Sequence, residues 1–426
     1  MRYRIGSLKI NYMFLIYSII GISCIAPLLK DLNSSATIIS YIPDVLNVLL
    51  FILAIVKKNK KSREFSHSII FLWIFFLIIF DISELFIFRQ NIFLFLWGVR
   101  NQYRFILFFV SCVILCNNSD LDKIDSFFRK LLLINFAVVF VEFLFGYMQD
   151  CLSGTFGITA GSNGSANLFL SVCFTSLLID YVYKKIKKSE MLFYGVGIFL
   201  WAALAELKYF IVLAAIMVII CLMITQRKKI NSRAFEISIF AIIGGISCIL
   251  LLEYVRPYYK DFFRLDSLIW YAKHVDMGVG GFGRLTAVPL TNKLFFNNKL
   301  SRIIFGIGLG SAEYSSIAIF DSPFHKLFGA YNYDTLFYAI TYIERGVLGL
   351  TWYFLFYLSS LNKSLFSKKV STDDEIMLKK NIICIVIAFF VSFYDDSLRR
   401  ASGGYVMFFL LAIPYVISKE YSIKKK

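Results

Sequence analysis

The chain has 426 residues, of which 58% are hydrophobic and only 17% are charged, and its mean hydropathy is +0.70. A soluble protein of this length could not bury so much apolar surface in one core, since ordinary globular chains carry about a quarter charged residues. The net charge of +17 would suit a nucleic-acid-binding protein, but the lysines and arginines stand in short clusters between apolar runs, a pattern that orients membrane helices.

Apolar runs of about 20 residues recur along the whole chain, and each is long enough to cross about 30 Å of hydrocarbon. They predict an all-α polytopic integral membrane protein with about twelve transmembrane helices. The first run lacks a small-residue cleavage site, so we expect a retained helix rather than a removed signal peptide. In chain order, the predicted spans are residues 10–29, 38–56, 67–88, 93–116, 131–149, 166–183, 191–205, 208–225, 235–253, 334–358, 382–395 and 403–418.

The basic clusters predict how these spans are oriented. They fall between alternate spans and at both ends of the chain, and basic loops of this kind stay in the cytoplasm. An even number of spans places both termini on the same side, so we expect the N- and C-termini to be cytoplasmic. The clearest clusters are residues 57–61, 184–188, 227–229 and 424–426.

The fourth predicted span is interrupted by Arg100 and Arg104. A charge near the centre of a bilayer costs about 2.5–3.5 kcal/mol on insertion scales. We therefore expect these two arginines to face a polar cavity or an interface within the protein rather than lipid.

The stretch from 254 to 333 is the only sizeable region predicted outside the membrane, and it lies on the non-cytoplasmic side. It holds two of the three histidines, nine basic residues and the glycine-rich pieces 278–284 and 306–310. Glycines let a backbone approach a ligand and expose N–H groups to anions, and arginine forks match phosphate oxygens. These features favour an anionic head group at the outer leaflet, and a solvated surface loop is the alternative.

Other polar residues fall near the same face. The turn between the seventh and eighth spans contains Glu206 and Lys208, the tenth span contains Glu344 and Arg345, and the last external turn spans 395–400. The second of these groups could instead be a structural ion pair between helices, and the third an exposed turn. Two adjacent aspartates in that turn do not make a metal site without a third ligand, so we expect neither a metal nor a cofactor.

Several motifs make the chain resemble the O-antigen polymerases of the Wzy type and their relatives, the O-antigen ligases and the capsule or exopolysaccharide polymerases. The similarity covers essentially the whole chain, with about twelve spans and one large late loop, so the resemblance implies one transmembrane polymerase domain over 1–426 with a large periplasmic loop at 254–333. The motifs that carry it are Gly154-Thr155-Phe156-Gly157 followed by Asn167, Glu206-Leu207-Lys208, Gly283-Arg284-Leu285 followed by residues 304–310, and Glu344-Arg345-Gly346-Val347-Leu348-Gly349.

Two departures separate the chain from the usual pattern of these relatives. Ligases usually carry a His-Asn pair ahead of the last motif, whereas this chain has Tyr331-Asn332-Tyr333-Asp334 there and His325 further upstream. The serine that usually precedes the residue corresponding to Lys208 is also absent. The first departure favours a polymerase over a ligase.

The resemblance implies a glycosyl transfer between two undecaprenyl-diphosphate-linked oligosaccharides at the periplasmic face of a bacterial inner membrane. It further implies a reaction without a metal ion, and a chain-length regulator and a flippase as partners. Such a transfer needs cations for the departing diphosphate and a base for the acceptor hydroxyl. The candidate bases are His325, Asp334 and Glu344. The candidate diphosphate-binding cations are Arg284, Lys208, Arg256 and Arg264.

Two other functions stay open on the sequence. A lipid-linked oligosaccharide flippase or another transporter would be expected to carry charges through the middle of many spans, whereas here the charges gather near one face. An O-antigen ligase would use the same chemistry with a different acceptor.

Overall fold

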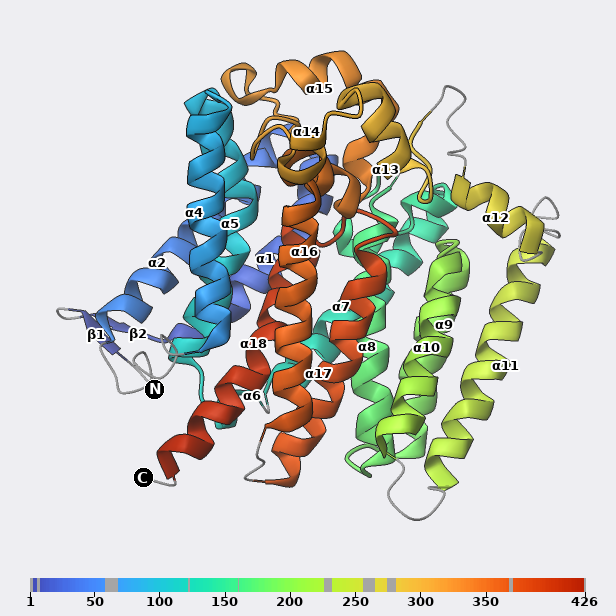
Figure 1. Cartoon of the computed structure of the whole chain (residues 1–426). Coiled ribbons are helices and arrows are strands. Elements are labelled where there is room, and N and C mark those ends of the chain that lie inside the picture. The colour runs from blue at the N-terminus through green and yellow to red at the C-terminus, as the bar shows by residue number, and fades with distance from the viewer. Residues whose placement is uncertain are drawn as a thin grey trace.

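The computed structural model describes residues 3–5, 8–57, 68–121, 123–159, 161–225, 232–255, 265–273, 281–367 and 371–424. Within these ranges, twelve helices of 15 residues or more form one bundle (Figure 1). Each of the twelve predicted spans overlaps one of them. The helices are α1 (Tyr12–Leu32), α2 (Ile42–Val56), α4 (Ile69–Ile87), α5 (Ile92–Leu115), α7 (Ile124–Leu144), α8 (Asn163–Val182), α9 (Lys188–Leu204), α10 (Lys208–Thr225), α11 (Ser232–Val255), α16 (Phe337–Phe366), α17 (Thr372–Val391) and α18 (Ala401–Lys424).

Eight helical segments in the described part of the chain are long and apolar enough to cross a membrane. They are α1, α2 with the preceding 3-10 turn η1 (Ser34–Tyr41), α4, α5, α8, α10, α11 and α18. Helix α9 is shorter, and α7, α16 and α17 carry more polar and charged residues. The chain is therefore a polytopic helical membrane protein. A short antiparallel hairpin, β1 (Tyr3–Ile5) and β2 (Leu8–Ile10), precedes α1.

Helices α8 and α18 form the centre of the bundle. The apolar window of α8 is 94% buried and that of α18 is 89% buried, compared with 17% for α11 at the edge. Small residues explain this position, because they let helices approach closely where lipid supplies no hydrophobic driving force. Gly404, for example, lies against the ring of Phe105 on α5. The Ile, Leu and Phe side chains exposed along α4 and α11 are those expected to face lipid.

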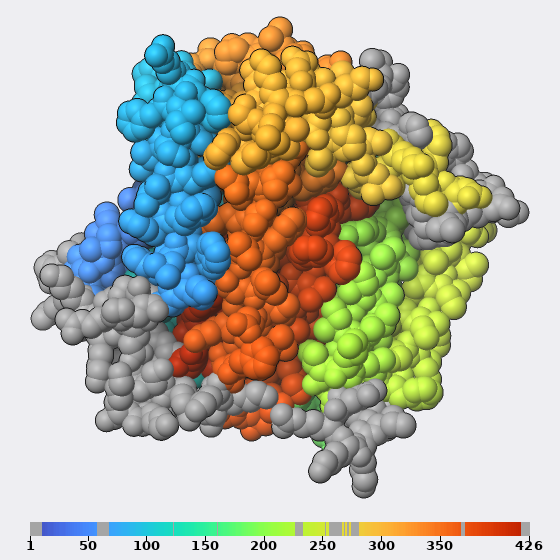
Figure 2. Space-filling model, viewed as in Figure 1, coloured from blue at the N-terminus to red at the C-terminus, as the bar shows by residue number. Residues whose placement is uncertain are grey.

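Residues 281–336 fold over one end of the bundle, and we call this segment the cap (Figure 1). Figure 2 shows it as a continuous yellow-to-orange layer above α16 and beside the upper end of α4. Its core is aromatic: Phe295 lies 4.9 Å from Phe324 and 4.8 Å from Phe328 between ring centroids, and buried Tyr333 packs against the same ring. The cap consists of α13 (Ala287–Leu290), the π-helical turn η5 (Thr291–Phe295), α14 (Leu300–Phe305), η6 (Ala318–Phe320), α15 (Pro323–Phe328), η7 (Gly329–Tyr331) and η8 (Tyr333–Thr335).

A break in α16 holds the cap in place. Gly346 has φ 58° and ψ −156°, which interrupts the helix and frees carbonyls of its first turns. The Ile307 N–H donates to the Ile343 carbonyl at 3.0 Å, and the Gly308 N–H donates to the Glu344 carbonyl at 2.8 Å. The hypothesis that the glycine-rich 306–310 piece cradles an anion is therefore wrong for these two N–H groups, because they serve the broken helix.

We expect Gly346→Ala to destabilise the protein. The backbone conformation at this position is almost confined to glycine and costs another residue about 1–3 kcal/mol. In addition, a Cβ there would lie 2.4 Å from the Ile304 carbonyl. The melting temperature of purified protein in detergent should fall by several degrees. Gly245→Ala on α11 is the matched control, since its Cβ would meet only Ile211 at an ordinary 3.6 Å. Equal melting temperatures for the two variants would contradict a tight fit at the helix break.

Candidate functional site

A buried ion pair lies beneath the cap. The Arg345 Nε donates to Asp81 Oδ1 at 2.8 Å and its NH2 donates to Asp81 Oδ2 at 2.6 Å, with both side chains essentially inaccessible. The third guanidinium nitrogen donates to Gln102 at 2.6 Å, and the Tyr103 hydroxyl donates to Asp81 at 2.6 Å. These contacts join α16 to α4 and α5. Arg345 is therefore part of an ion pair between helices, which was the structural alternative to a functional role.

Glu344, one of the three candidate bases, is completely buried. Its Oε1 accepts a hydrogen bond from the Ala312 N–H at 3.3 Å, and its Oε2 has no hydrogen-bond partner within the described residues. Arg399 lies close by in an ion pair with Glu313. In this conformation the cap closes Glu344 off from any substrate, so Glu344 is the least accessible of the three candidates.

The other two candidate bases lie together at the surface of the cap. His325 Nε2 is 3.8 Å from Asp334 Oδ2, and its Nδ1 is 3.6 Å from Asp321 Oδ1. The His325 side chain is 20% exposed and the Asp334 side chain is 33% exposed. Asn332, in the left-handed region at φ 53°, reverses the direction of the chain after α15 and brings Asp334 close to His325.

Burial raises the pKa of Asp334 above its usual value, against the lowering effect of His325, and the Asp396 carboxylate adds to the rise. A carboxyl group next to an imidazole is an arrangement that can accept and pass on a proton. This pair is the best-placed acid–base group in the cap.

The last predicted external turn is not a solvated surface. The side chain of Arg399 is only 12% exposed and pairs with Glu313 of the cap. The Arg399 carbonyl accepts a hydrogen bond from Arg104 at 3.0 Å, and Arg400 pairs with Asp396 at 2.9 Å. The turn at 392–400 therefore links the cap to the helices below it.

Arg284 and the start of α10 meet at this turn. The Arg284 Nε donates to the Tyr394 carbonyl at 3.0 Å, and its guanidinium lies 4.2 Å from the centroid of the Tyr394 ring. Tyr394 stacks on Tyr209 with 3.7 Å between ring centroids, and Tyr209 follows Lys208 at the start of α10. The structure thus brings Arg284 and the Lys208 region together. The other two candidate cations, Arg256 and Arg264, lie outside the described residues.

A basic cavity of about 260 Å³ lies below this turn. It confirms the expectation that Arg100 and Arg104 face a polar cavity, since both line its wall. The residues that give it polarity come from α1, η1, α5, α8, the 392–400 turn and α18. They are the cations Lys30, Arg100, Arg104 and Arg400 and the hydroxyl groups of Ser23, Ser40, Ser165 and Ser402. Only the pair on α5 could be found from the sequence, because the remaining residues come from distant segments.

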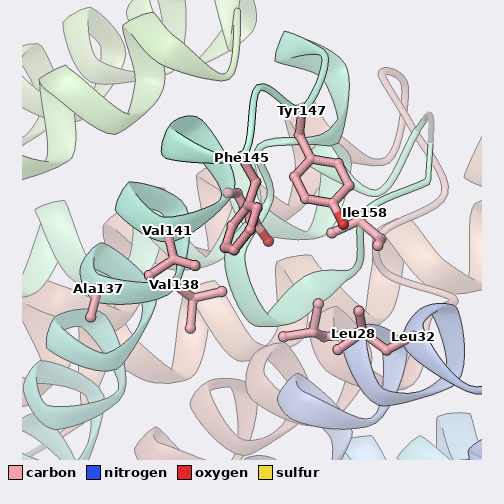
Figure 3. A pocket seen from close by; sticks show the side chains of 9 residues that line it. Leu28, Leu32, Ala137, Val138, Val141, Phe145, Tyr147 and Ile158 are labelled. Atoms are coloured by element: carbon pink, nitrogen blue, oxygen red, sulfur yellow. The ribbon is translucent and has the colours of Figure 1, made fainter.

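An apolar cavity of about 470 Å³ lies between α1 and α7. Figure 3 shows Leu28 and Leu32 of α1 facing Val138, Val141 and Phe145 across it. Glu142 is the only acidic or basic residue among those that line it.

The Gly154–Gly157 turn separates the two cavities, with Phe156 lining the basic one and Ile158 the apolar one. Buried side chains of α7 hold this turn: Asn135 accepts from the Thr155 N–H at 2.9 Å and Glu142 from the Gly154 N–H at 3.0 Å. The motif is thus a fixed turn rather than a mobile loop.

No protein-family model matches the chain, and a search of curated proteins finds no match.

We expect the stability of the protein to depend on pH through Asp395. Burial raises the pKa of Asp395 to about 6, from an ordinary value of 3.8, and Ser397 opposes this rise. Because the folded state binds this proton more tightly than the unfolded chain does, Asp395 stabilises the fold fully below a pH of about 4, and this contribution is lost as the pH rises to about 6.

Asp395 accepts a hydrogen bond from the Ser397 N–H at 2.8 Å. The variant Asp395→Asn keeps an oxygen that can accept this bond, but its side chain cannot ionise. It should therefore melt at a higher temperature than the wild type at pH 7 and at a similar temperature at pH 4. Melting temperatures in detergent across this range give the comparison. Parallel profiles for the two proteins would show that the ionisation of Asp395 is not coupled to folding.

Proposed function

We propose that the protein is a polysaccharide repeat-unit polymerase of the O-antigen type. A hydroxyl oxygen of the new lipid-linked repeat unit attacks the anomeric carbon of the growing chain. The bond from that carbon to the lipid diphosphate breaks, the electron pair leaves with the diphosphate, and the hydroxyl proton passes to a base. The products are a longer lipid-linked glycan and undecaprenyl diphosphate.

The observation that carries this proposal is the arrangement of the cap end. A partly exposed acid–base pair, His325 and Asp334, and a basic cavity both lie near the 392–400 turn. Arg400 lines the cavity and pairs with Asp396, whose carboxylate also acts on the pKa of Asp334. Glycosyl transfer from a diphosphate needs these two elements close together, one for the proton and one for the departing charge.

We assign the proton transfer to the His325–Asp334 pair and keep Glu344 as a third candidate that would need the cap to open. Arg284 and Lys208 are proposed to bind a substrate diphosphate, since they meet at the same turn. The aromatic side chains of the cap offer faces on which sugar rings can stack.

The proposed setting is the inner membrane of a bacterium, with twelve spans, both termini in the cytoplasm and the cap in the periplasm. Figure 1 is consistent with this orientation, because the hairpin β1–β2 and the C-terminal end of α18 lie away from the cap. A chain-length regulator and the flippase that delivers repeat units are the proposed partners.

The second candidate is a lipid-linked oligosaccharide flippase. The buried charges of α7, α8 and α17 favour it, since Lys380 pairs with Asp125 at 2.6 Å and with Asp180 at 2.7 Å within the bundle. These charges satisfy one another, however, as a structural network would. An O-antigen ligase remains the third candidate.

A strain that lacks this gene distinguishes these candidates. If the protein is a polymerase, single repeat units should still reach the cell surface, whereas a missing flippase should trap lipid-linked units at the cytoplasmic face. A gel of the surface polysaccharide, with the lipid-linked pool measured beside it, provides the readout. Long chains in the deletion strain would refute the polymerase.

The base is tested by returning variants to that strain. His325→Ala and Asp334→Asn should lower the polymerisation rate by about 100-fold or more, the usual range for loss of a general base, and shift the gel to short chains. Lys326→Ala is the matched control, because Lys326 stands on the same helix with a side chain that is 57% exposed. Long chains from both His325→Ala and Asp334→Asn would exclude this pair.

A further inference from the structure

We propose that the basic cavity is a seat for the diphosphate of a lipid-linked substrate, separate from the Arg284 and Lys208 group. This inference rests on the proposed function and extends it, because a polymerase handles two lipid diphosphates at once, one on the growing chain and one on the acceptor. Neither Arg284 nor Lys208 lines the cavity. The chain therefore has two basic groups at the cap end for two anionic substrates.

The charge of the cavity matches a diphosphate that carries a glycan. Four cations line it, and two carboxylates pair with them: Asp44 accepts from Arg100 Nε at 2.9 Å and lies 3.5 Å from Arg104, and Asp396 pairs with Arg400. Two positive charges are left over. A diphosphate esterified at both ends carries two negative charges, so the ligand would neutralise the cavity.

Two of the cations have capacity for a ligand. Lys30 makes no ion pair with any residue that the structure describes, and Arg104 Nε is buried there without a hydrogen-bond partner. A buried, unpaired guanidinium N–H is unfavourable in a membrane protein unless something accepts its hydrogen bond. Phosphate oxygens are the natural acceptors for such a group.

Hydroxyl groups and helix starts add further donors. Ser402 donates to Ser165 at 3.0 Å, which leaves the Ser165 proton for a ligand oxygen. These serines stand in the first turns of α18 and α8, which both begin at the cavity. The N-terminal turn of a helix carries a partial positive charge, and two such turns converge here.

The position of the cavity favours a membrane-bound source for the anion. Arg100 is eight residues into α5, which places it about 12 Å along the helix from its start. The cavity therefore lies among the helices rather than in the cap, at a depth reached by a lipid head group. The apolar cavity on the other face of α1 offers room for part of a hydrocarbon chain nearby.

The cavity also suits the substrate that loses its diphosphate. Arg400 belongs to both the cavity and the ion pair with Asp396, and Asp396 acts on Asp334. The departing diphosphate and the acceptor proton would thus be held on two sides of one turn. We therefore assign the cavity to the growing chain, whose bond to the diphosphate breaks.

Binding of a short lipid diphosphate tests this assignment without any measurement of activity. The full-length protein in detergent is titrated with geranylgeranyl diphosphate by calorimetry, with inorganic pyrophosphate and geranylgeraniol as comparison ligands. The seat predicts that geranylgeranyl diphosphate binds more tightly than either. Equal binding of pyrophosphate would identify a free-anion site, and equal binding of geranylgeraniol would identify a site for the chain alone; both results would overturn the proposal.

Two variants sharpen the test. Lys30→Gln should weaken binding about tenfold or more, as expected for loss of one charge-assisted contact. Lys299→Gln removes the same charge from the exposed surface of the cap and should leave affinity unchanged. Asp44→Asn should instead tighten binding, because it frees two arginines, and thermal melting establishes that each variant is folded. Equal losses in both lysine variants would contradict a specific seat.

The binding experiment and the genetic experiment can refute the seat and the polymerase separately. If Lys30→Gln still bound the probe as the wild type does but the deletion strain lost long chains, the seat would be wrong and the polymerase would stand. If binding followed the predicted pattern while the deletion strain kept long chains, the seat would stand for a lipid diphosphate in another reaction.

Discussion

The ion pair between Arg345 and Asp81 is the contact on which the cap end depends. Two charges inside a membrane bundle are tolerable only together, because removing one partner of a buried pair typically costs about 3–5 kcal/mol. Gln102 accepts from the third guanidinium nitrogen of Arg345 and Tyr103 donates to Asp81, so the pair fixes the rotation of α16 against α4 and α5. The helix break lies one residue further along α16, and its position relative to the cap follows from that rotation.

From this point the cap and the turn at 392–400 are built by short-range contacts. The carbonyls freed by the helix break accept hydrogen bonds from the 306–310 backbone, and Glu313 further along the cap forms an ion pair with Arg399. The next residue, Arg400, reaches the cavity. A chain of fixed contacts thus connects a buried structural charge to the groups proposed to carry out the chemistry, and the chemistry itself stays at the edge of the bundle.

Much of the fold follows from the sequence because each span is a local property. The twelve apolar runs predicted the positions of twelve long helices, since backbone groups in lipid must form their hydrogen bonds within the segment. Helix α17 shows the limit: its predicted start at 382 is ten residues late, because Lys379 and Lys380 read as loop charges. In the structure these lysines are neutralised by Glu375, Asp125 and Asp180. The candidate site is less local. Arg100 and Arg104 predict a polar cavity because they place charge within a span, whereas Lys30 and Arg400, 370 residues apart, join it only through tertiary packing.

The order of synthesis gives the cavity a further property. Its walls come from α1 and α5, which leave the ribosome early, and from α18, whose first turn supplies Ser402 and follows directly on Arg400. A chain interrupted before α18 can insert most of its helices but cannot close the cavity. Segments emerge from the N-terminus onward, so this cavity could bind an anion only after α18 has joined the bundle. The proposed seat in this cavity is therefore inert toward a lipid diphosphate until α18 is in place.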